Sequence, residues 1–574
     1  TLSSGTSVGL ASLGASPVLS GGTLVLLSGD SSSTAFSVAG ASTIQNPTSG
    51  SARLSGVFSG AGSLTFTGSG TTVLSGANTY SGGTTVTAGT LSLASADVLS
   101  TSADLTVSGT GTLAIGANNN TVGNVVVSGG AITGTTGILT GSSYSVTNST
   151  GTTLISAILA GTATLTKTGD GTLTLSANNT YTGNTAINGG TVSVTGSLAD
   201  TAAVTVATGA TYAVDQTDTI GSIAGAGAIV LASGKSLSSG SAGSTTFSGV
   251  ISGSGGLTKL GSSTLTLSGA STNTGNVLVS AGTLLVGNSA SNTTASLGGN
   301  LTVASGATLA GFGTVGGAGK TVTNNGTVSP GGNSIGTLNI TGAYLQSAGG
   351  NLSINALPTS NDLLAISGAA TLDGLVTFTA ASGSYTPTRY TLLTSGGRSG
   401  IFSALATNLG DYSSLGYFLS YDENNVYLTL GPDYVNTLSS ISENANALTK
   451  TFGSNAAAQF AGLNYDCKLF DEKNACLSLG GRITTVDGSG QENINSSAAI
   501  VVGAHKVSDQ LRIGAWVDQN INMQHSNVKL TNGMPMFGFF AAYSPEGDDS
   551  GTQIKASASY ANKDLLINRT ALLN

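Results

Sequence analysis

Apolar and polar residues alternate in short runs along most of the chain. Three such runs are Ser63-Leu-Thr-Phe-Thr67, Asp104-Leu-Thr-Val-Ser108 and Gly111-Thr-Leu-Ala-Ile115, and each is followed within a few residues by Gly, Ser or Asn. A period of two with many Val and Thr residues is typical of β-strands that bury one face. The pattern therefore predicts many short strands joined by tight turns.

These strands recur in units of similar length. Strand starts at Gly89, Gly111 and Gly130 follow one another at spacings of 22 and 19 residues. Repeated strand–turn units of about 20 residues are typical of a solenoid. A longer unit occurs three times, with starts 101 and 92 residues apart, at residues 74–91, 175–192 and 267–284.

Stacking of such units explains which residue types the chain uses. Inward Leu, Val and Ile would form apolar columns, outward Thr and Ser would meet water, and Gly and Asn would occupy the corners. Long charged side chains would repel their copies one rung above. We interpret five asparagines as corner residues, with hydrogen-bonded ladders along the rod as one arrangement open to them: Asn118, Asn119, Asn120, Asn178 and Asn179.

Composition narrows the class of protein. The chain has 574 residues, of which 86 are Gly and only 7% are charged. The charged fraction is far below that of ordinary soluble domains, whereas 39% hydrophobic residues argue against disorder. The formal net charge of -8 supplies no basic field for phosphates. A typical soluble enzyme domain is therefore excluded, and nucleic acid is not expected as a partner.

Charge density changes sharply along the chain. Residues 1–432 contain 19 charged residues, whereas the much shorter segment 433–574 contains 23. A change of this size predicts a domain boundary near residue 432. No run of 18 apolar residues occurs, so no transmembrane helix is expected.

The amino-acid sequence around the long unit resembles a known repeat. Segments 165–175 (Leu-Thr-Lys-Thr-Gly-Asp-Gly-Thr-Leu-Thr-Leu) and 257–267 (Leu-Thr-Lys-Leu-Gly-Ser-Ser-Thr-Leu-Thr-Leu) are similar to the passenger-associated strand repeat of bacterial autotransporters, the type V secretion family. The resemblance implies that residues 1–309 form a right-handed parallel β-helix displayed outside the cell. It also implies export through a β-barrel that belongs to the same protein.

A second resemblance begins at Ala310. Segments 311–316, 324–338, 362–368 and 425–430 are similar in order to the C-terminal passenger region of pertactin-like autotransporters. That resemblance implies that residues 310–432 are an autochaperone region, which folds first outside the membrane and templates the coils behind it.

Residues 433–465 are predicted to form a linker helix. Apolar residues at alternating steps of three and four indicate an amphipathic helix. Further along, the side chains become small, at Ala456, Ala457 and Ala458. The family resemblance implies a helix inside the translocation barrel, and an ordinary surface helix is the alternative. The apolar positions are Leu438, Ile441, Ala445, Leu448 and Phe452.

Residues 466–574 contain five amphipathic segments of about ten residues, a length that suits transmembrane β-strands. A soluble antiparallel sheet is the alternative. Five strands cannot close a barrel without leaving unpaired edges. The expected fold is thus all-β: a parallel β-helix, a short helix and an incomplete antiparallel barrel, truncated in this sequence. The segments are 477–486, 498–507, 510–520, 536–543 and 552–560.

The chain has two cysteines, Cys467 and Cys476, both in the charged segment. Their separation suits one local disulfide in an oxidising compartment, with free thiols as the alternative. Two cysteines far from both histidines lack the usual spacing of metal ligands, so no metal site is expected.

Candidate catalytic motifs lack their partners. Gly332-Asn-Ser-Ile-Gly336 and Gly29-Asp-Ser31 each place a serine in a nucleophile-like context, but no histidine precedes His505. A hydroxyl nucleophile needs such a base. Thr168-Gly-Asp-Gly171 lacks the tandem Asp array of a calcium repeat. His505 and His525 are interpreted as barrel or loop residues, and no catalytic, cofactor-binding or metal-binding residue is expected.

The combined prediction is a surface-displayed, non-catalytic passenger that acts as an adhesin or in cell-to-cell association. A self-assembling extracellular sheath or matrix is the alternative, and a passenger esterase or protease ranks third. Expected partners are the outer membrane with its barrel-assembly machinery, and host or neighbouring-cell surfaces, glycans or further copies of the chain. The expected location is the bacterial outer membrane and cell surface.

Overall fold

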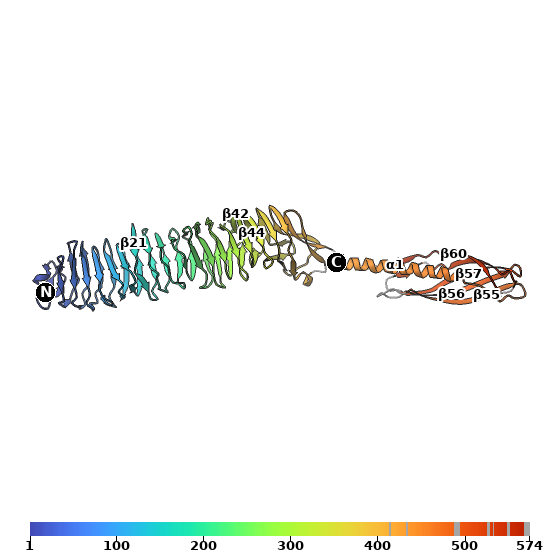
Figure 1. Ribbon diagram of the computed structural model, residues 1–574, viewed down its shortest axis with the longest axis horizontal. Helices are drawn as coiled ribbons and strands as arrows, with labels where there is room; N and C mark the ends of the chain where they lie inside the picture. The colour runs from blue at the N-terminus through green and yellow to red at the C-terminus, as the bar shows by residue number, and fades with distance from the viewer. Residues whose placement is uncertain are drawn as a thin grey trace. The chain divides into compact units, whose positions relative to one another are not determined.

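The computed structural model describes residues 1–412, 415–431, 434–486, 494–524, 528–531, 533–547 and 551–567 (Figure 1). The chain divides into two compact units. Unit 1 comprises Thr1–Ser413 with Phe418–Thr429, and unit 2 comprises Ser414–Tyr417 with Leu430–Asn574. We describe each unit by itself.

Unit 1 is a right-handed parallel β-solenoid of about 19 turns, which confirms the predicted fold class. One continuous parallel sheet, the first sheet, runs from β2 (Ser7–Gly9) to β52 (Ala404–Thr407). Its strands pair with the strand one turn later, as β23 (Leu165–Lys167) pairs with β25 (Thr185–Ile187) at Leu165↔Thr185. This offset of 20 residues is the period that the sequence predicts.

The other faces of the coil are formed by two further long sheets and by two short ones, which run from β1 (Leu2–Ser3) to β9 (Phe58–Ser59) and from β16 (Asn120–Thr121) to β22 (Ile158–Ala160). The second sheet runs from β5 (Ser31–Ser32) to β34 (Val250–Gly253), and the third from β29 (Asp218–Thr219) to β53 (Gly416–Tyr421). The strands lengthen late in the unit, to 11 residues in β42 (Thr314–Asn324) and 10 in β44 (Thr337–Gln346), where Figure 1 shows broader coils. The change in sequence wording at Ala310 thus coincides with a change in strand length.

Apolar side chains stack in columns inside the coil. Leu173, Val192 and Tyr212 occupy one register position in three successive turns, and each is fully buried. Burying one such side chain is worth about 1.5–3 kcal/mol. Because every turn contributes several of them, the interior closes without long loops or a separate core.

The third copy of the long unit is rotated about the coil by one face. In the second copy the strands β23, β24 (Thr172–Leu175), β25 and β26 (Thr191–Val194) alternate between the first and second sheets. In the third copy the corresponding strands alternate between the third and first sheets: β35 (Gly256–Lys259), β36 (Thr264–Leu267), β37 (Val277–Val279) and β38 (Thr283–Val286).

The spacing of the copies explains this rotation. Copies one and two start 101 residues apart, which is five whole turns, whereas copies two and three start 92 residues apart. The second spacing is shorter than five turns by one face. The third copy therefore begins on the face that precedes the one on which the second copy begins. All faces accept the unit because each has the same alternation of buried apolar and outward polar residues.

Unit 2 combines one helix with an antiparallel sheet of five strands, as the sequence predicts. The helix α1 spans Tyr434–Gly462. Among the described residues, no helix combines the length and the hydropathy that crossing a membrane requires. The strands are β55 (Ala475–Val486), β56 (Ile494–Lys506), β57 (Leu511–Gln524), β59 (Met536–Tyr543) and β60 (Ile554–Tyr560), and a separate small pair is β58 (Val528–Leu530) with β61 (Leu565–Ile567).

The apolar stripe predicted for α1 is not its buried face. Ile441 is 47% exposed and Phe452 is 65% exposed. Ala445 is exposed, Leu448 is half-buried, and the side chain of Leu438 lies outside the described residues. The buried positions are small instead, because small side chains allow the helix to approach the strands closely: Ala447, Thr451, Ser454 and Ala458.

Close approach of successive turns makes some glycines irreplaceable. Gly130 and Gly151 both have positive φ, +69° and +64°. A Cβ on Gly130 would lie 2.0 Å from the carbonyl oxygen of Gly111, whereas one on Gly151 would meet nothing within 4 Å.

We expect Gly151→Ala to cost about 1–2 kcal/mol of unfolding free energy from backbone strain alone. Gly130→Ala should cost roughly 1–3 kcal/mol more than Gly151→Ala, because its Cβ also meets the adjacent turn. Denaturant unfolding measures both variants. Equal losses of unfolding free energy would contradict the close approach of the turns at Gly130.

Candidate functional surfaces

The outer face of the solenoid carries unbroken columns of threonine. On the first sheet, five successive turns place a threonine at one register position, and each hydroxyl side chain points outward while its strand neighbours are buried. Neighbouring hydroxyls along such a column are about 4.8 Å apart. The five residues are Thr23, Thr43, Thr65, Thr85 and Thr106.

The second sheet has matching columns. Thr71, Thr90 and Thr112 follow one another in register, and a further run of four begins at Thr152 and ends at Thr211. Charge is almost absent from this region, since no charged residue occurs between Arg53 and Asp97. The solenoid therefore offers long surfaces of methyl and hydroxyl groups with little electrostatic field.

One corner of the coil is closed by buried polar side chains. The side-chain oxygens of Asn78, Asn120 and Asn179 accept hydrogen bonds from the backbone N–H groups of Phe58, Val98 and Leu159, respectively, at 2.8–3.0 Å. Each bond joins one turn to the next turn along the coil. The predicted corner role is thus confirmed for Asn120 and Asn179, and Asn78, which the prediction did not include, has the same role. These three amides bond to the backbone of the adjacent turn rather than to one another.

Asp218 occupies the same corner position as these asparagines. Its carboxylate accepts the backbone N–H of Leu198 at 3.1 Å, and its side chain is 4% exposed. Burial raises the pKa of Asp218 to about 6, although the N–H groups of Leu198 and Thr219 act in the opposite direction. At neutral pH the solenoid therefore holds an ionised carboxylate where related turns hold a neutral amide.

Asp218→Asn should stabilise unit 1 at neutral pH. Because the folded-state pKa is raised, the neutral form favours folding: stability is highest below pH 4 and falls as pH rises through about 6. The amide removes this loss, so we expect a gain of roughly 1–2 kcal/mol at pH 7.5 and no gain at pH 4. Denaturant unfolding at both pH values measures it, with the exposed Asp411→Asn as the control. A gain that is equal at both pH values would contradict the assignment.

The two serine motifs lack a catalytic partner in unit 1. Ser334 is exposed in a turn in which its own backbone N–H bonds to the carbonyl of Gly331. The nearby carboxylate of Asp362 accepts the N–H groups of Gly336 and Asn355, so it holds the loop. Ser31 is exposed on β5.

The turn 168–171 is already occupied by a cation. The ammonium of Lys167 is fully buried and donates to the carbonyls of Thr168 and Gly169, both at 2.7 Å. Lys259, at the same position in the third copy, bonds its own turn in the same way. In the described part of the chain, no three His, Cys, Asp or Glu residues are grouped to hold a metal ion. His505 is exposed at the end of β56, and His525 lies outside the described residues.

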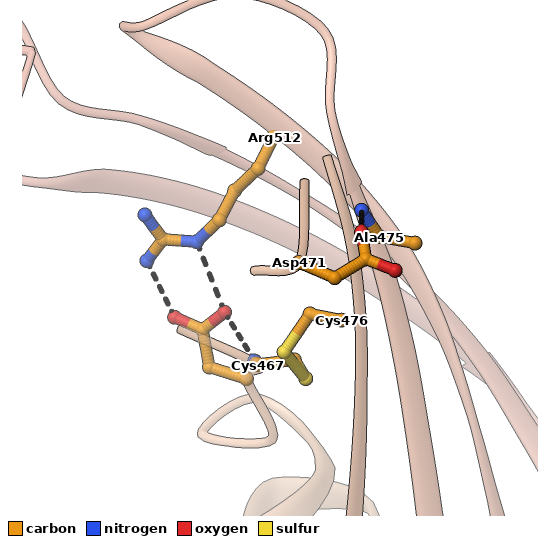
Figure 2. Close-up of a disulfide and its surroundings, with 6 residues drawn as sticks. Cys467, Asp471, Ala475, Cys476 and Arg512 are labelled. Carbon is orange, nitrogen blue, oxygen red and sulfur yellow. Dashed lines mark hydrogen bonds and ion pairs between the residues drawn. A yellow bond between two sulfur atoms is a disulfide. The ribbon is translucent and has the colours of Figure 1, made fainter. Parts of the chain in front are cut away.

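Cys467 and Cys476 form a disulfide in unit 2, with Cα atoms 5.8 Å apart (Figure 2). Asp466, directly before Cys467, forms an ion pair of 2.7 Å with Arg512 of β57 and also accepts the backbone N–H of Cys467. Within the enclosed loop, Asp471 accepts the N–H of Ala475 at 2.8 Å. The disulfide and these bonds fix the segment between α1 and β55 against the sheet.

The inner face of the five-stranded sheet mixes apolar and charged side chains, since Arg482 and Asp518 form a buried ion pair there at 3.1 Å. This face packs against α1 around Trp516, whose ring contacts Tyr465 edge-on with the ring centroids 5.0 Å apart. The opposite face leaves large apolar side chains exposed. Nine of these are Leu477, Leu479, Ile483, Ile513, Phe537, Phe539, Tyr543, Ile554 and Tyr560, each at least 40% exposed.

Comparison with family models finds one match. The passenger-associated-transport-repeat matches residues 64–93, 165–194 and 257–286. The first segment runs from β10 (Leu64–Gly68) to β13 (Thr90–Leu93), and the other two correspond to β23–β26 and β35–β38. These matches point to an autotransporter passenger. The matched strands all lie in the solenoid, so the repeat and the fold together support a secreted passenger. No curated protein matches this sequence.

Removal of the disulfide should weaken unit 2 and spare the passenger solenoid. The bond closes a short loop, which corresponds to roughly 2.7 kcal/mol in the loop-entropy model. We expect Cys467→Ser with Cys476→Ser to lose about this much stability in unit 2, measured by Trp516 fluorescence during denaturant unfolding. Trp516 is the single tryptophan of the chain and reports on unit 2 alone. An unchanged fluorescence midpoint would contradict the prediction.

Proposed function

We propose that this chain is a surface-displayed, non-catalytic autotransporter passenger that acts as an adhesin or in cell-to-cell association. Unit 2 is proposed to be part of the outer-membrane β-barrel through which the passenger is exported. The observation that carries the adhesive role is the unbroken outward column of threonines on the first sheet. Identical groups repeated along a rod allow many weak contacts to form at once.

The chemistry of the surface supports adhesion over catalysis. Hydroxyl and methyl groups of threonine suit neutral partners such as glycans, to which a charged face would bring desolvation costs. The first 504 residues contain no histidine to activate a serine. The matched repeat family implies a protein secreted across the outer membrane, which is where an adhesive rod would act.

The barrel assignment rests on the exposed apolar face of the unit 2 sheet. Side chains such as Leu479, Ile483 and Phe539 are 69–82% exposed, whereas the opposite face packs against α1. Large contiguous apolar surfaces are rare on soluble monomers and suit lipid. Aromatic residues near strand ends, such as Tyr543 and Tyr560, are typical of membrane interfaces.

The hydroxyl column supplies the test of adhesion. We compare cells that display the chain with cells that display the triple variant T65V/T85V/T106V, which keeps the shape and β-propensity of threonine but removes three hydroxyls. Adhesion and aggregation should fall by about tenfold, since each lost hydrogen bond is worth about 0.5–1 kcal/mol. The matched variant T65S/T85S/T106S keeps the hydroxyls and should remain close to wild type.

Other outcomes separate the competing functions. Unchanged adhesion of the valine variant would contradict the proposed surface. Concentration-dependent filaments of the purified chain in electron micrographs would favour the sheath or matrix alternative, for which the uncharged faces of the solenoid are the supporting observation. Hydrolysis of esters or peptides that is lost in Ser334→Ala or Ser31→Ala would favour an enzyme.

A further inference from the structure

A cationic pocket lies at the disulfide end of the sheet in unit 2. It has a volume of about 210 Å³, and its lining includes Lys468, Lys506 and Arg512. Lys468 directly follows Cys467, so the disulfide holds its backbone beside the strands. Lys506 is the last residue of β56 and Arg512 is the second residue of β57, so the two flank the turn between these strands.

Two carboxylates pair with these cations, and they do not cancel the charge equally. Asp466 pairs with Arg512 in a largely buried contact at 2.7 Å, and this pair is part of the fixed structure. Asp509 pairs with Lys506 at 3.1 Å, but its side chain is 90% exposed. Exposed pairs of this kind contribute little. The three cations therefore exceed the two carboxylates, and Lys468 and Lys506 remain available to an anion.

Exposed apolar side chains are next in sequence to two of the lysines that line the pocket, and Leu511 itself lines it. Leu469, next to Lys468, is 91% exposed, and Val507, next to Lys506, is 54% exposed. The exposed face of the sheet begins at the same end, where Leu511, Tyr543 and Ile554 are aligned across β57, β59 and β60. A cationic pocket bordered by exposed aliphatic and aromatic side chains matches an anionic headgroup with acyl chains attached.

We propose that this pocket binds the phosphate of an anionic phospholipid, with Lys468 and Lys506 on the phosphate and the acyl chains along the outer face of the sheet. This proposal rests on the proposed membrane location of unit 2 and adds to it a lipid class and a site. The disulfide is then a positioning device, because it fixes Lys468 at the pocket mouth.

The test uses the full chain with vesicles of phosphatidylcholine, with or without phosphatidylglycerol, and measures the bound fraction by flotation. Phosphatidylglycerol should raise binding, and Lys468→Ala should reduce that gain about fivefold, since a cation near an anionic membrane is worth about 1 kcal/mol. Lys473→Ala is the matched control: it lies in the same loop, is exposed, and does not line the pocket. Its gain should stay close to wild type.

The remaining outcomes distinguish this site from the membrane assignment. Binding to phosphatidylcholine without a gain from phosphatidylglycerol would overturn the headgroup site and leave the membrane location intact. Absence of binding to either vesicle would overturn both. Equal losses in Lys468→Ala and Lys473→Ala would show diffuse charge attraction and overturn the site. Binding of inorganic phosphate that is lost in Lys468→Ala, without any gain from phosphatidylglycerol, would assign the pocket to free phosphate and overturn the lipid proposal.

Discussion

The constraint on which the solenoid depends is the short distance between successive turns. Parallel strands stack about 4.8 Å apart, so every side chain lies next to the residue one turn earlier and one turn later. A residue type that tolerates its own copy at this distance can form a column, and one that repels its copy cannot. The low charge of residues 1–432, the threonine columns and the buried Leu173–Val192–Tyr212 stack all follow from this rule.

The same constraint decides which polar groups can be buried. Asn78 and Asn179 are buried because their amides bond the backbone of the adjacent turn, and Lys167 because two carbonyls of its own turn accept its protons. Asp218 makes the same kind of hydrogen bond to the adjacent turn, but its ionised form carries a charge. Burial disfavours that charged form and so raises the pKa of Asp218. These buried polar groups therefore join one turn to the next or close their own turn, and the raised pKa of Asp218 is accounted for by its burial in such a position.

Much of the fold could be predicted from the sequence because strand alternation and repeat length are local properties. Period-two runs and the 20-residue spacing predict the coil, and the amphipathic segments predict five strands of unit 2, for example Met536–Tyr543. The spacings of 101 and 92 residues imply the rotation of the third copy. That implication can be drawn only when the number of faces per turn is known. The apolar stripe did not predict the buried face of α1, because close packing, rather than hydrophobicity, selects that face.

The surfaces were harder to predict than the fold, since they depend on contacts between residues far apart in sequence. The pocket beside the disulfide needs β56, β57 and the loop after α1 in one place, and no single segment signals it. The threonine columns are visible only when each turn is aligned with the next. Since stacking fixes the interior of every turn, the proposed adhesive contacts can involve outward positions only. Within such positions, a column is the smallest unit that can bind strongly, because one threonine contributes little and a row contributes by addition.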